Sequence, residues 1–533
     1  MSALDRGLRR RQGVVIALAA IFVSGCAVGP DFKVPAAPDT TGYTKGPLPA
    51  RTASADTALG EAQRFQKEKD ISGTWWQLFH SRALNSLIEK SLEANPTLQS
   101  AIAALRVAKF GVYAQEGHYF PTVQANYNPT RQETASDLSP VLNNNLQSQN
   151  PFNLFTAQVM VSYTPDVWGL NRRTVESLQA QADNQRFAVE AAWLTLTSNI
   201  VVAAIQEASL RGQIEATHRI IDINKKMLDV MRKQFETGYA NRSDLAAQEA
   251  ALAQVEATLP PLERQLAIQR DLLTALAGRL PSDQPSETFR LADMKLPVDL
   301  PVSLPSKLIE QRPDVRQAEE SLHAASAQVG VAIANILPNF TITGNRGYTA
   351  VQMANLISSP NIFWNVAGNA TQTLFDGFTL INQARAASAG YDQAAWSYRN
   401  AVIAALQNVA DTLAALETDA TALKAARNFE RAAKISLDLA QQQMQTGNAN
   451  VLLLLTAQQT YLQAVIQVVQ AQANRLSDTA ALFQALGGGW WNRDRPPATV
   501  QTFDVSTGRA QPLKEDESKG WPEFRWVTHV WGQ

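Results

Sequence analysis

Two long stretches of the chain repeat apolar residues with the spacing of a helix. One runs from Trp168 to about Glu236 without a proline, and the other starts near Gly377. In the first stretch, apolar residues recur at steps of four and three, as in a heptad seam: Val189, Trp193, Leu196, Ile200 and Ala203. The second stretch keeps this spacing: Val402, Leu406, Val409, Leu413, Leu416, Ala420 and Leu423. The first helix would be about 100 Å long at 1.5 Å per residue, so it must pack laterally against other helices.

Each long stretch is followed by a short polar turn and a second helical run. The turns Gln234–Asn241 and Gln443–Asn450 share the pattern Thr-Gly-x-Ala-Asn. A glycine that closes one helix just before another helix is typical of an αα-hairpin. The first return run continues the seam, with these residues: Leu252, Val255, Leu259, Leu262 and Leu266. Pro260-Pro261 is predicted to bend it, and the second return helix is predicted from about Val451 to Leu486.

Further landmarks repeat in the same order and indicate an internal duplication. They are three matched pairs: Asn95-Pro96-Thr97-Leu98 with Arg312-Pro313-Asp314-Val315, Phe120-Pro121 with Leu337-Pro338, and Val167-Trp168-Gly169 with Phe375-Asp376-Gly377. In each half, one proline is predicted to open a short helix and a second proline to end it.

A pair of strands is predicted in each half, between the proline-opened helix and the long helix. Apolar residues alternate with polar ones there: Val123, Ala125, Tyr127, Val159, Val161 and Tyr163, then Phe340, Ile342, Gly344, Trp364, Val366, Gly368 and Ala370. This period of two predicts strands with one apolar face. A long polar loop that includes Asn143–Asn150 joins the first pair. The pattern fits an outer-membrane barrel, and equally a soluble hairpin.

The fold class is therefore predicted to be mainly α with a small β part. Within the first repeat, Trp75-Trp76 is predicted to open a short helix that carries Leu84, Leu87 and Ile88. The predicted boundaries are these: first repeat 74–280 with strand pair about 121–165 and hairpin tip 237–242, irregular proline-rich linker 281–304, second repeat 305–487 with strand pair about 339–373 and hairpin tip 446–450, and C-terminal tail 488–533.

The N-terminus has the layout of a bacterial export signal. Arginines precede the apolar run Val14–Val23, which Ser24-Gly25-Cys26 follows. Cys26 is the only cysteine and stands where a lipobox places the acylated residue, so we predict a signal peptide over 1–25 and a lipid on Cys26. An ordinary signal peptide with an incidental cysteine is the alternative. The segment 26–73 is predicted to be extended on the surface.

Charge and composition argue against several classes of function. The net charge of −1 gives no indication of a nucleic-acid partner. No run of about 20 apolar residues follows the N-terminus, so no transmembrane helix is expected and any span must be β. The five histidines are scattered, and Gly487-Gly488-Gly489 follows a helix rather than the strand of a phosphate-binding loop. We expect no enzyme activity, no metal and no cofactor.

The strand count has a consequence for assembly. Four strands cannot close a membrane barrel, because known barrels have about eight or more. Open sheet edges are not tolerated in lipid, so several chains must share one barrel if the strands enter a membrane. Two similar repeats in each chain suit a ring around an axis.

The chain resembles the outer-membrane factor family, the TolC- and OprM-like channels of tripartite efflux and type I secretion systems. Cys26–Phe32, the two Thr-Gly-x-Ala-Asn turns, Phe375-Asp376-Gly377 and Ala485–Trp490 are most similar to its NodT-type lipoprotein branch. The resemblance implies a homotrimer whose shared 12-stranded barrel crosses the outer membrane and whose α-helical tunnel lies in the periplasm. Such a trimer is a passive duct for small molecules, supplied by a periplasmic adaptor and an inner-membrane pump of the resistance-nodulation-division type.

The resemblance also implies sites. The hairpin tips would dock the adaptor and pump, through Thr237, Gly238, Asn241, Thr446, Gly447 and Asn450. The tunnel gate would include Asp244, Leu452, Leu453 and Thr456. Family members often carry aspartates at the last two positions, so we predict an apolar gate closed by Leu452 rather than a cation-binding aspartate ring. Ordinary seam packing of Leu452 and Leu453 is the alternative.

Two other functions compete with the duct. A periplasmic adaptor also has a coiled-coil hairpin, but it would have a single hairpin between β-rich halves. A lipid-anchored coiled-coil scaffold without a pore would keep the hairpins and use the strands as soluble hairpins.

Overall fold

The computed structural model describes most of the chain, in these ranges: 27–40, 42–67, 69–133, 151–445, 451–493, 501–504 and 509–512. These residues form two compact units. The first unit contains residues up to Pro35 together with Arg106–Asn184 and Ala318–Tyr398. The second contains Ala36–Leu105, Gln185–Gln317 and the residues from Arg399 onward. Each unit contains residues from both repeats, so the two units do not correspond to the two repeats.

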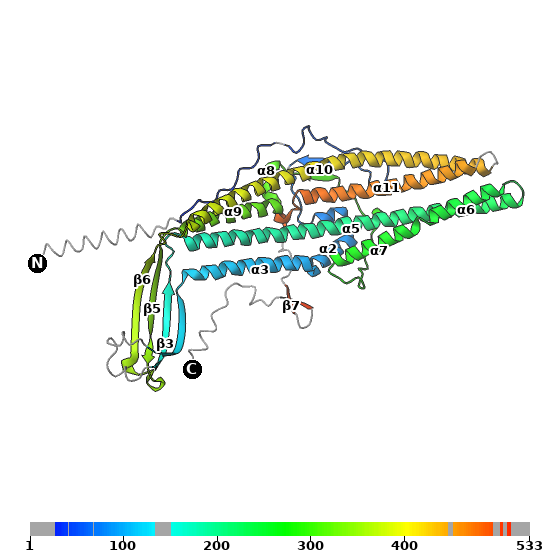
Figure 1. Cartoon of the computed structure of the whole chain (residues 1–533). Coiled ribbons are helices and arrows are strands. Elements are labelled where there is room, and N and C mark those ends of the chain that lie inside the picture. The colour runs from blue at the N-terminus through cyan, green and yellow to red at the C-terminus, as the bar shows by residue number, and fades with distance from the viewer. Residues whose placement is uncertain are drawn as a thin grey trace. The chain divides into compact units, whose positions relative to one another are not determined.

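The first unit holds a four-stranded antiparallel sheet in the order β2-β3-β5-β6 (Figure 1). The strands are β2 Thr122–Gln132, β3 Phe152–Tyr163, β5 Asn339–Ala350 and β6 Ile362–Thr371. The register places Val123 opposite Val161, Val161 opposite Gly344, and Gly344 opposite Val366. Both predicted strand pairs are confirmed, and they join into one sheet through β3 and β5.

The helices that flank the strands begin and end as the landmarks predict. They are α3 Pro96–Glu116, α5 Leu170–Glu236, α9 Pro313–Ala334 and α10 Thr379–Gln445. Gly169 and Gly377 have φ of +79° and +66°, so each glycine turns the chain into its long helix. Asp166 and Asp376 each accept two backbone N–H groups from the first turn of α5 and α10. Both repeats therefore start their long helix in the same way.

The second unit contains the return helices and most of the buried core. The return helices are α6 Arg242–Glu256, α7 Leu259–Leu276 and α11 Val451–Ala485. The first return is interrupted between Glu256 and Leu259, just before Pro260-Pro261, which confirms the predicted bend. Both heptad seams are confirmed, because every seam residue of α5 is buried and all those of α10 except the half-buried Leu406 are buried as well.

The prediction of one short helix from Trp75 is wrong. Trp75–Phe79 is a 3-10 helix and α2 runs separately from Arg82 to Ala94. His80 has φ +53°, which ends the first helix, and the Ser81 hydroxyl accepts the Leu84 N–H at the start of the second. Trp75 stacks on Phe483 of α11 with 5.4 Å between ring centroids.

The prediction of a surface segment over 26–73 and an irregular linker over 281–304 is also wrong in part. The strand β1 Arg64–Lys67 pairs in parallel with β4 Asp299–Val302. Arg475 of α11 is buried and donates to the carbonyl oxygens of Leu59 and Glu61, at 2.7 and 2.6 Å. Charge-assisted bonds to backbone oxygens hold this segment in place, and such bonds leave no hydrophobic period.

The remaining elements are short. They are the helix α8 Pro305–Gln311, the strands β7 Gln501–Asp504 and β8 Arg509–Pro512, and the 3-10 helices Gly117–Tyr119, Leu291–Asp293, Met353–Asn355, Ser359–Asn361 and Trp490–Asn492. Positive φ at Gly487, Gly488 and Gly489 turns the chain out of α11. The Trp490 indole N–H then donates to the Gln311 carbonyl at 2.7 Å, and Arg493 forms an ion pair with Glu190 at 2.7 Å. The start of the tail is therefore packed against the second unit.

Two helices, α5 and α11, are long and apolar enough to cross a membrane by length and composition. The count of apolar runs in the sequence did not indicate this. Buried helices of a protein core meet the same criterion, and 67% of the most apolar window of α5 is buried. The apolar residues of α5 serve the seam.

Candidate functional site

The sheet of the first unit has one apolar and one polar face. Paired residues of neighbouring strands share a face, and large apolar residues on the first face are exposed: Val123, Tyr127, Val159, Val161, Ile342, Ile362, Trp364 and Val366. The opposite face carries amides: Gln124, Asn126, Gln158, Asn345, Asn365 and Asn369. A band of exposed apolar side chains opposite a polar face is the pattern of a sheet that faces lipid on one side and water on the other.

The two outer strands of this sheet have an unpaired edge. Among the described residues, β2 pairs only with β3 and β6 only with β5. Their free N–H and C=O groups would be unsatisfied in hydrocarbon. The sheet of one chain is therefore incomplete as a membrane structure.

The first hairpin tip shows what each residue of its motif does. The Thr237 hydroxyl donates to the Lys233 carbonyl at 2.9 Å, and Gly238 has φ +80°. The Tyr239 N–H reaches back to the Gln234 carbonyl at 2.8 Å, as in a helix C-cap. Asn241 caps α6 by accepting the Asp244 N–H at 2.8 Å.

These local roles account for Thr237, Gly238 and Asn241. Tyr239 contributes only its backbone N–H to the cap, and the residue is 89% exposed. The second tip residues, Thr446, Gly447 and Asn450, lie outside the described residues.

The predicted gate residues are on the surface of the single chain. Leu452 is 67% exposed and Leu453 49% exposed, while Val451 and Leu454 are buried in a cluster with methionines of α5 and α10. The Thr456 hydroxyl donates to the Leu452 carbonyl at 2.8 Å, so it lies one turn further along the helix. Asp244 is half-buried in the first turn of α6. In this chain Leu452 and Leu453 are not seam residues.

The segment Ala27–Phe32 is held by a built receptor, which we call the N-terminal clasp and which consists of Trp168, Gly169, Arg173, His323 and Gly330. The Val28 N–H donates to the Trp168 carbonyl at 3.0 Å. The Arg173 side chain, 5% exposed, donates to the Val28 carbonyl at 3.1 Å and pairs with Asp31 at 2.8 Å. The ring of Phe32 stacks on that of His323 at 4.3 Å.

Glycine is required where the clasp meets this segment. A Cβ on Gly330 would lie 2.9 Å from the Val28 carbonyl oxygen, and one on Gly169 would lie 2.6 Å from the Ala27 Cβ. Sequence reasoning missed the clasp, although the matching Gly29-Pro30-Asp31 belongs to the motif it used. Cys26 itself lies outside the described residues.

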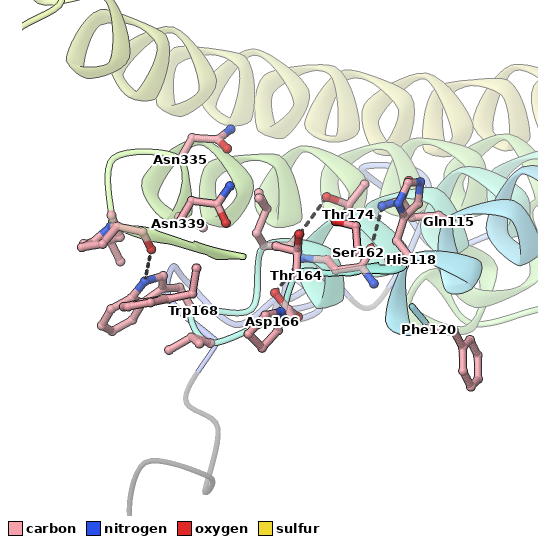
Figure 2. A pocket seen from close by; sticks show the side chains of 18 of the residues that line it. Gln115, His118, Phe120, Ser162, Thr164, Asp166, Trp168, Thr174, Asn335 and Asn339 are labelled. Atoms are coloured by element: carbon pink, nitrogen blue, oxygen red, sulfur yellow. Dashed lines mark hydrogen bonds between the residues drawn. The ribbon is translucent and has the colours of Figure 1, made fainter. Parts of the chain in front are cut away.

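The best-defined cavity of the first unit, about 580 Å³, lies where the strands meet the helices (Figure 2). Its lining includes Gln115, His118 and Asn335, and the Trp168 indole N–H donates across it to the Pro338 carbonyl at 2.8 Å. The one carboxylate of the lining, Asp166, is committed to capping α5. The described residues hold no group of three or more potential metal ligands. The cavity lining thus offers mainly hydrogen-bonding groups.

A family model described as outer membrane efflux protein matches residues 87–279 and 304–488, which is most of the chain. The chain belongs to this family. Membership confirms the predicted fold class, the outer-membrane location and the role as the outer-membrane component of an efflux or export system. The family consists of channels rather than enzymes.

Relatives and solved structures agree with the assignment. A probable efflux pump outer membrane protein, TtgC of Pseudomonas putida, is 26% identical over 480 residues, which cover 90% of this chain and 96% of the relative. The pyoverdine export outer membrane protein OpmQ of Pseudomonas aeruginosa is 26% identical over 458 residues, 84% of this chain and 94% of the relative.

The fold is that of solved channels. The outer-membrane channel OprN superposes with a TM-score of 0.74 and 24% identity, over 87% of this chain and 100% of that one. The open state of MtrE from Neisseria gonorrhoeae gives a TM-score of 0.74 and 24% identity, over 88% and 100%.

Proposed function

We propose that three copies of this chain form a passive duct through which small molecules leave the cell. The observation that carries the proposal is the four-stranded sheet with two open edges and one exposed apolar face. Three such sheets joined edge to edge give a closed barrel of twelve strands, an even number within the known range. Closure satisfies the backbone groups of β2 and β6, which no single chain can do in lipid.

Exposed apolar side chains on the helices support assembly with further copies. Trp396 and Ile403 of α10 and Val107 of α3 are all more than half exposed. A stable monomer rarely exposes several large apolar side chains along its long helices. We infer that they pack against the neighbouring chains of the trimer.

The lipid on Cys26 remains part of the proposal. The N-terminal clasp holds Val28 against Trp168, at the connection between β3 and α5. An acyl group on the residue before Ala27 would therefore lie close to where the strands leave the membrane. This geometry supports a lipid anchor at the inner leaflet.

The partners follow from the family. We propose that the tips Thr237–Asn241 and Thr446–Asn450 dock a periplasmic adaptor and a pump of the resistance-nodulation-division type. Relatives are named for toluene efflux and pyoverdine export, and we propose that this chain likewise carries small molecules chosen by its pump. The duct needs neither catalysis nor a cofactor.

We propose an apolar gate formed by Leu452 and Leu453, with Thr456 and Asp244 beside it. Leu452→Ala should raise the single-channel conductance in a planar bilayer, because the removed side chain is large and exposed. Tyr239→Ala is the control, since Tyr239 is also a large exposed side chain, at 89% against 67% for Leu452, but lies at the tip. Unchanged conductance in Leu452→Ala would count against this gate.

The mass of the detergent-extracted particle, protein only, tests the duct. Three chains per particle and conductance in a planar bilayer are expected. A single chain per particle would refute the shared barrel and favour a lipid-anchored scaffold without a pore.

A further inference from the structure

Within the first unit, the four helices that flank the strands and the turns that join them to the strands expose large apolar residues mainly at two edges. At the β2 edge these residues lie on α3 and in the turn after it: Val107, Phe110, Tyr113, Tyr119 and Phe120. At the β6 edge they lie in the turn after β6 and on α10: Leu374, Phe375, Phe378, Ile381, Tyr391 and Trp396. The helices between the edges, α5 and α9, expose only Leu170 among the described residues of this unit. The exposed apolar residues therefore lie where a second copy would join the sheet.

The turn after β6 presents an aromatic ring on an anchored backbone. Phe375 is 81% exposed, and the ring of Phe378 lies edge-on to it with 6.2 Å between centroids. Before Phe375, the Gln372 side chain donates to the Ile336 carbonyl at 2.8 Å. After it, Asp376 caps α10. An exposed ring that is already held in place loses little conformational freedom when a partner covers it.

The turn before β2 presents a second ring in the same manner. Phe120 is 62% exposed, and its N–H donates to the Gly117 carbonyl at 3.1 Å. Pro121 follows and limits the backbone further. Figure 2 shows the Phe120 ring pointing away from the other labelled residues of the cavity lining. Phe120 and Phe375 thus stand at opposite edges of one sheet, both at its helical end.

The strand register shows how the edges of two copies would align. Thr122, the first residue of β2, is level along the hydrogen-bonding direction with Ala367 of β6, through Ser162 and Thr343. β6 ends at Thr371, four residues beyond Ala367. Four residues over three strand spacings correspond to a tilt of about 40°, at about 3.3 Å per residue and about 4.8 Å between strands. Membrane barrels have this tilt, so the strand ends lie at one height in the membrane.

The same tilt carried into a second copy brings the two rings together. The start of β2 in the next chain then lies opposite the end of β6, and the polar face must continue into the polar face. Thr122 of the next chain is therefore opposite Thr371 or Thr373. Phe120, two residues earlier, is opposite Thr373 or Phe375. In the first pairing Phe375 is the diagonal neighbour of Phe120, within reach of an aromatic side chain.

We propose that Phe120 of one chain packs against Phe375 and Phe378 of the next chain, at the helical end of each joint between β2 and β6. The inference rests on the proposed function, which joins three sheets edge to edge, and it names the contact that ends each joint. Strand pairing stops near Thr122 and Thr371, where the chain turns into the helices. Aromatic pairs hold their partners with a preferred geometry, and their burial excludes water from the end of the joint.

The test is cross-linking of the full-length protein with a short bifunctional thiol reagent, because the only native cysteine is Cys26. F120C/F375C should give covalent products of up to three chains. T122C/T373C keeps both rings and should give the same products. R131C/F375C is the control, because Arg131 lies at the other end of β2. It should give none, as should wild type.

Protein mass of the detergent-extracted particle separates the outcomes. Particles of three chains that neither matched pair cross-links, or that R131C/F375C cross-links equally well, would overturn this inference and leave the duct standing. Wild-type particles of one chain would refute the proposed duct itself.

A second variant tests whether the rings hold the chains together. F120A/F375A should make the three-chain particle dissociate about tenfold faster in denaturing detergent, because burial of one phenylalanine is worth about a factor of ten or more. Y239A removes an exposed aromatic ring at the hairpin tip and should dissociate as wild type does. Dissociation of F120A/F375A at the wild-type rate would show that lipid, rather than a second copy, covers these rings, and would overturn the inference.

Discussion

The two return helices share a turn motif but differ in how they pack. In α6 and α7, the buried residues are Gln248, Leu273 and Thr274. In α11, an unbroken helix of 35 residues, fifteen residues are buried, among them Leu454, Leu476 and Leu482. The first return helix therefore lies largely open in one chain, and the second is part of the core.

The difference shows that duplication did not keep the two hairpins equivalent. Counting from Gly238 and Gly447, Pro260 corresponds to Val469 and Leu245 to Leu454. The prolines interrupt the first return, while α11 passes the same point without a break and contacts α5 near Gly212. The second hairpin supplies the buried seam, and the first supplies a surface that a neighbouring chain can cover.

A proline placed in α11 at the position that matches Pro260 should have the largest effect on the difference between the two return helices. We expect Val469→Pro to lower the free energy of unfolding by about 4 kcal/mol, because proline inside a helix costs about 3 kcal/mol or more and the Val469 contact is lost as well. Thermal unfolding of the purified protein by circular dichroism measures it. Pro260→Ala is the reciprocal change, and we expect it to be neutral or stabilising. Equal destabilisation by both changes would contradict the asymmetry.

Truncating matched leucines should give the next largest effect. Leu454→Ala removes a fully buried side chain, so we expect a loss of about 3 kcal/mol, whereas Leu245→Ala at the half-buried matched position should lose about 1 kcal/mol. Denaturant unfolding of the two variants side by side measures the difference. Similar losses would mean that assembly buries Leu245 as deeply as Leu454.

The cap of the first return helix should matter less. Asn241→Ala removes the acceptor for the Asp244 N–H, so we expect a loss of about 1 kcal/mol. Asn241→Ser is the control, because serine also accepts the bond. The readout is limited proteolysis near the tip, and equal cleavage of the alanine and serine variants would show that the cap has no effect.

The two hairpins should also differ, by a smaller amount, in how their stability depends on pH. Burial and the hydrogen bond with Asp478 of α11 raise the pKa of Asp419 of α10 to about 7, partly offset by Arg475. The folded protein thus holds a proton that the unfolded chain releases above about pH 4, so this stabilisation is complete below pH 4 and is lost as the pH rises through 7.

The expected change is about 1 kcal/mol or less, since the pair is only half-buried, or about 2 °C in melting temperature. Asp419→Asn should show a flatter melting profile between pH 5 and pH 8. The matched positions of the first hairpin are Leu210 and Gln269, which do not titrate there. A wild-type profile as flat as that of Asp419→Asn would refute the effect.

The sequence predicted the elements with a period and missed the contacts without one. The seams on α5 and α10 and the strand pairs were predicted correctly, because burial of one face imposes a spacing on apolar residues. Arg475 and Arg173 hold extended segments through backbone oxygens, and neither the strand β1 nor the N-terminal clasp leaves such a spacing. Arg475 lies in a helix of mostly small and apolar residues, which could have marked it, whereas Arg173 lies among polar residues and carried no such signal.

The candidate site was predicted unevenly for the same reason. The capping roles at Thr237, Gly238 and Asn241 follow from the turn chemistry of the motif. The direction in which the Leu452 and Leu453 side chains point cannot be predicted from the sequence. A run of four leucines, Leu452–Leu455, covers every side of a helix turn.

The open edges of β2 and β6 also bear on the kinetics of biogenesis. A chain with two unpaired edges has no stable membrane-inserted form alone, so insertion depends on meeting other chains at the membrane. The rate of maturation should then rise more steeply than in proportion to the amount of chain synthesised. A cell that makes little of this protein would accumulate it as a waiting periplasmic intermediate, exposed to proteases, and would acquire working ducts abruptly above a threshold of expression.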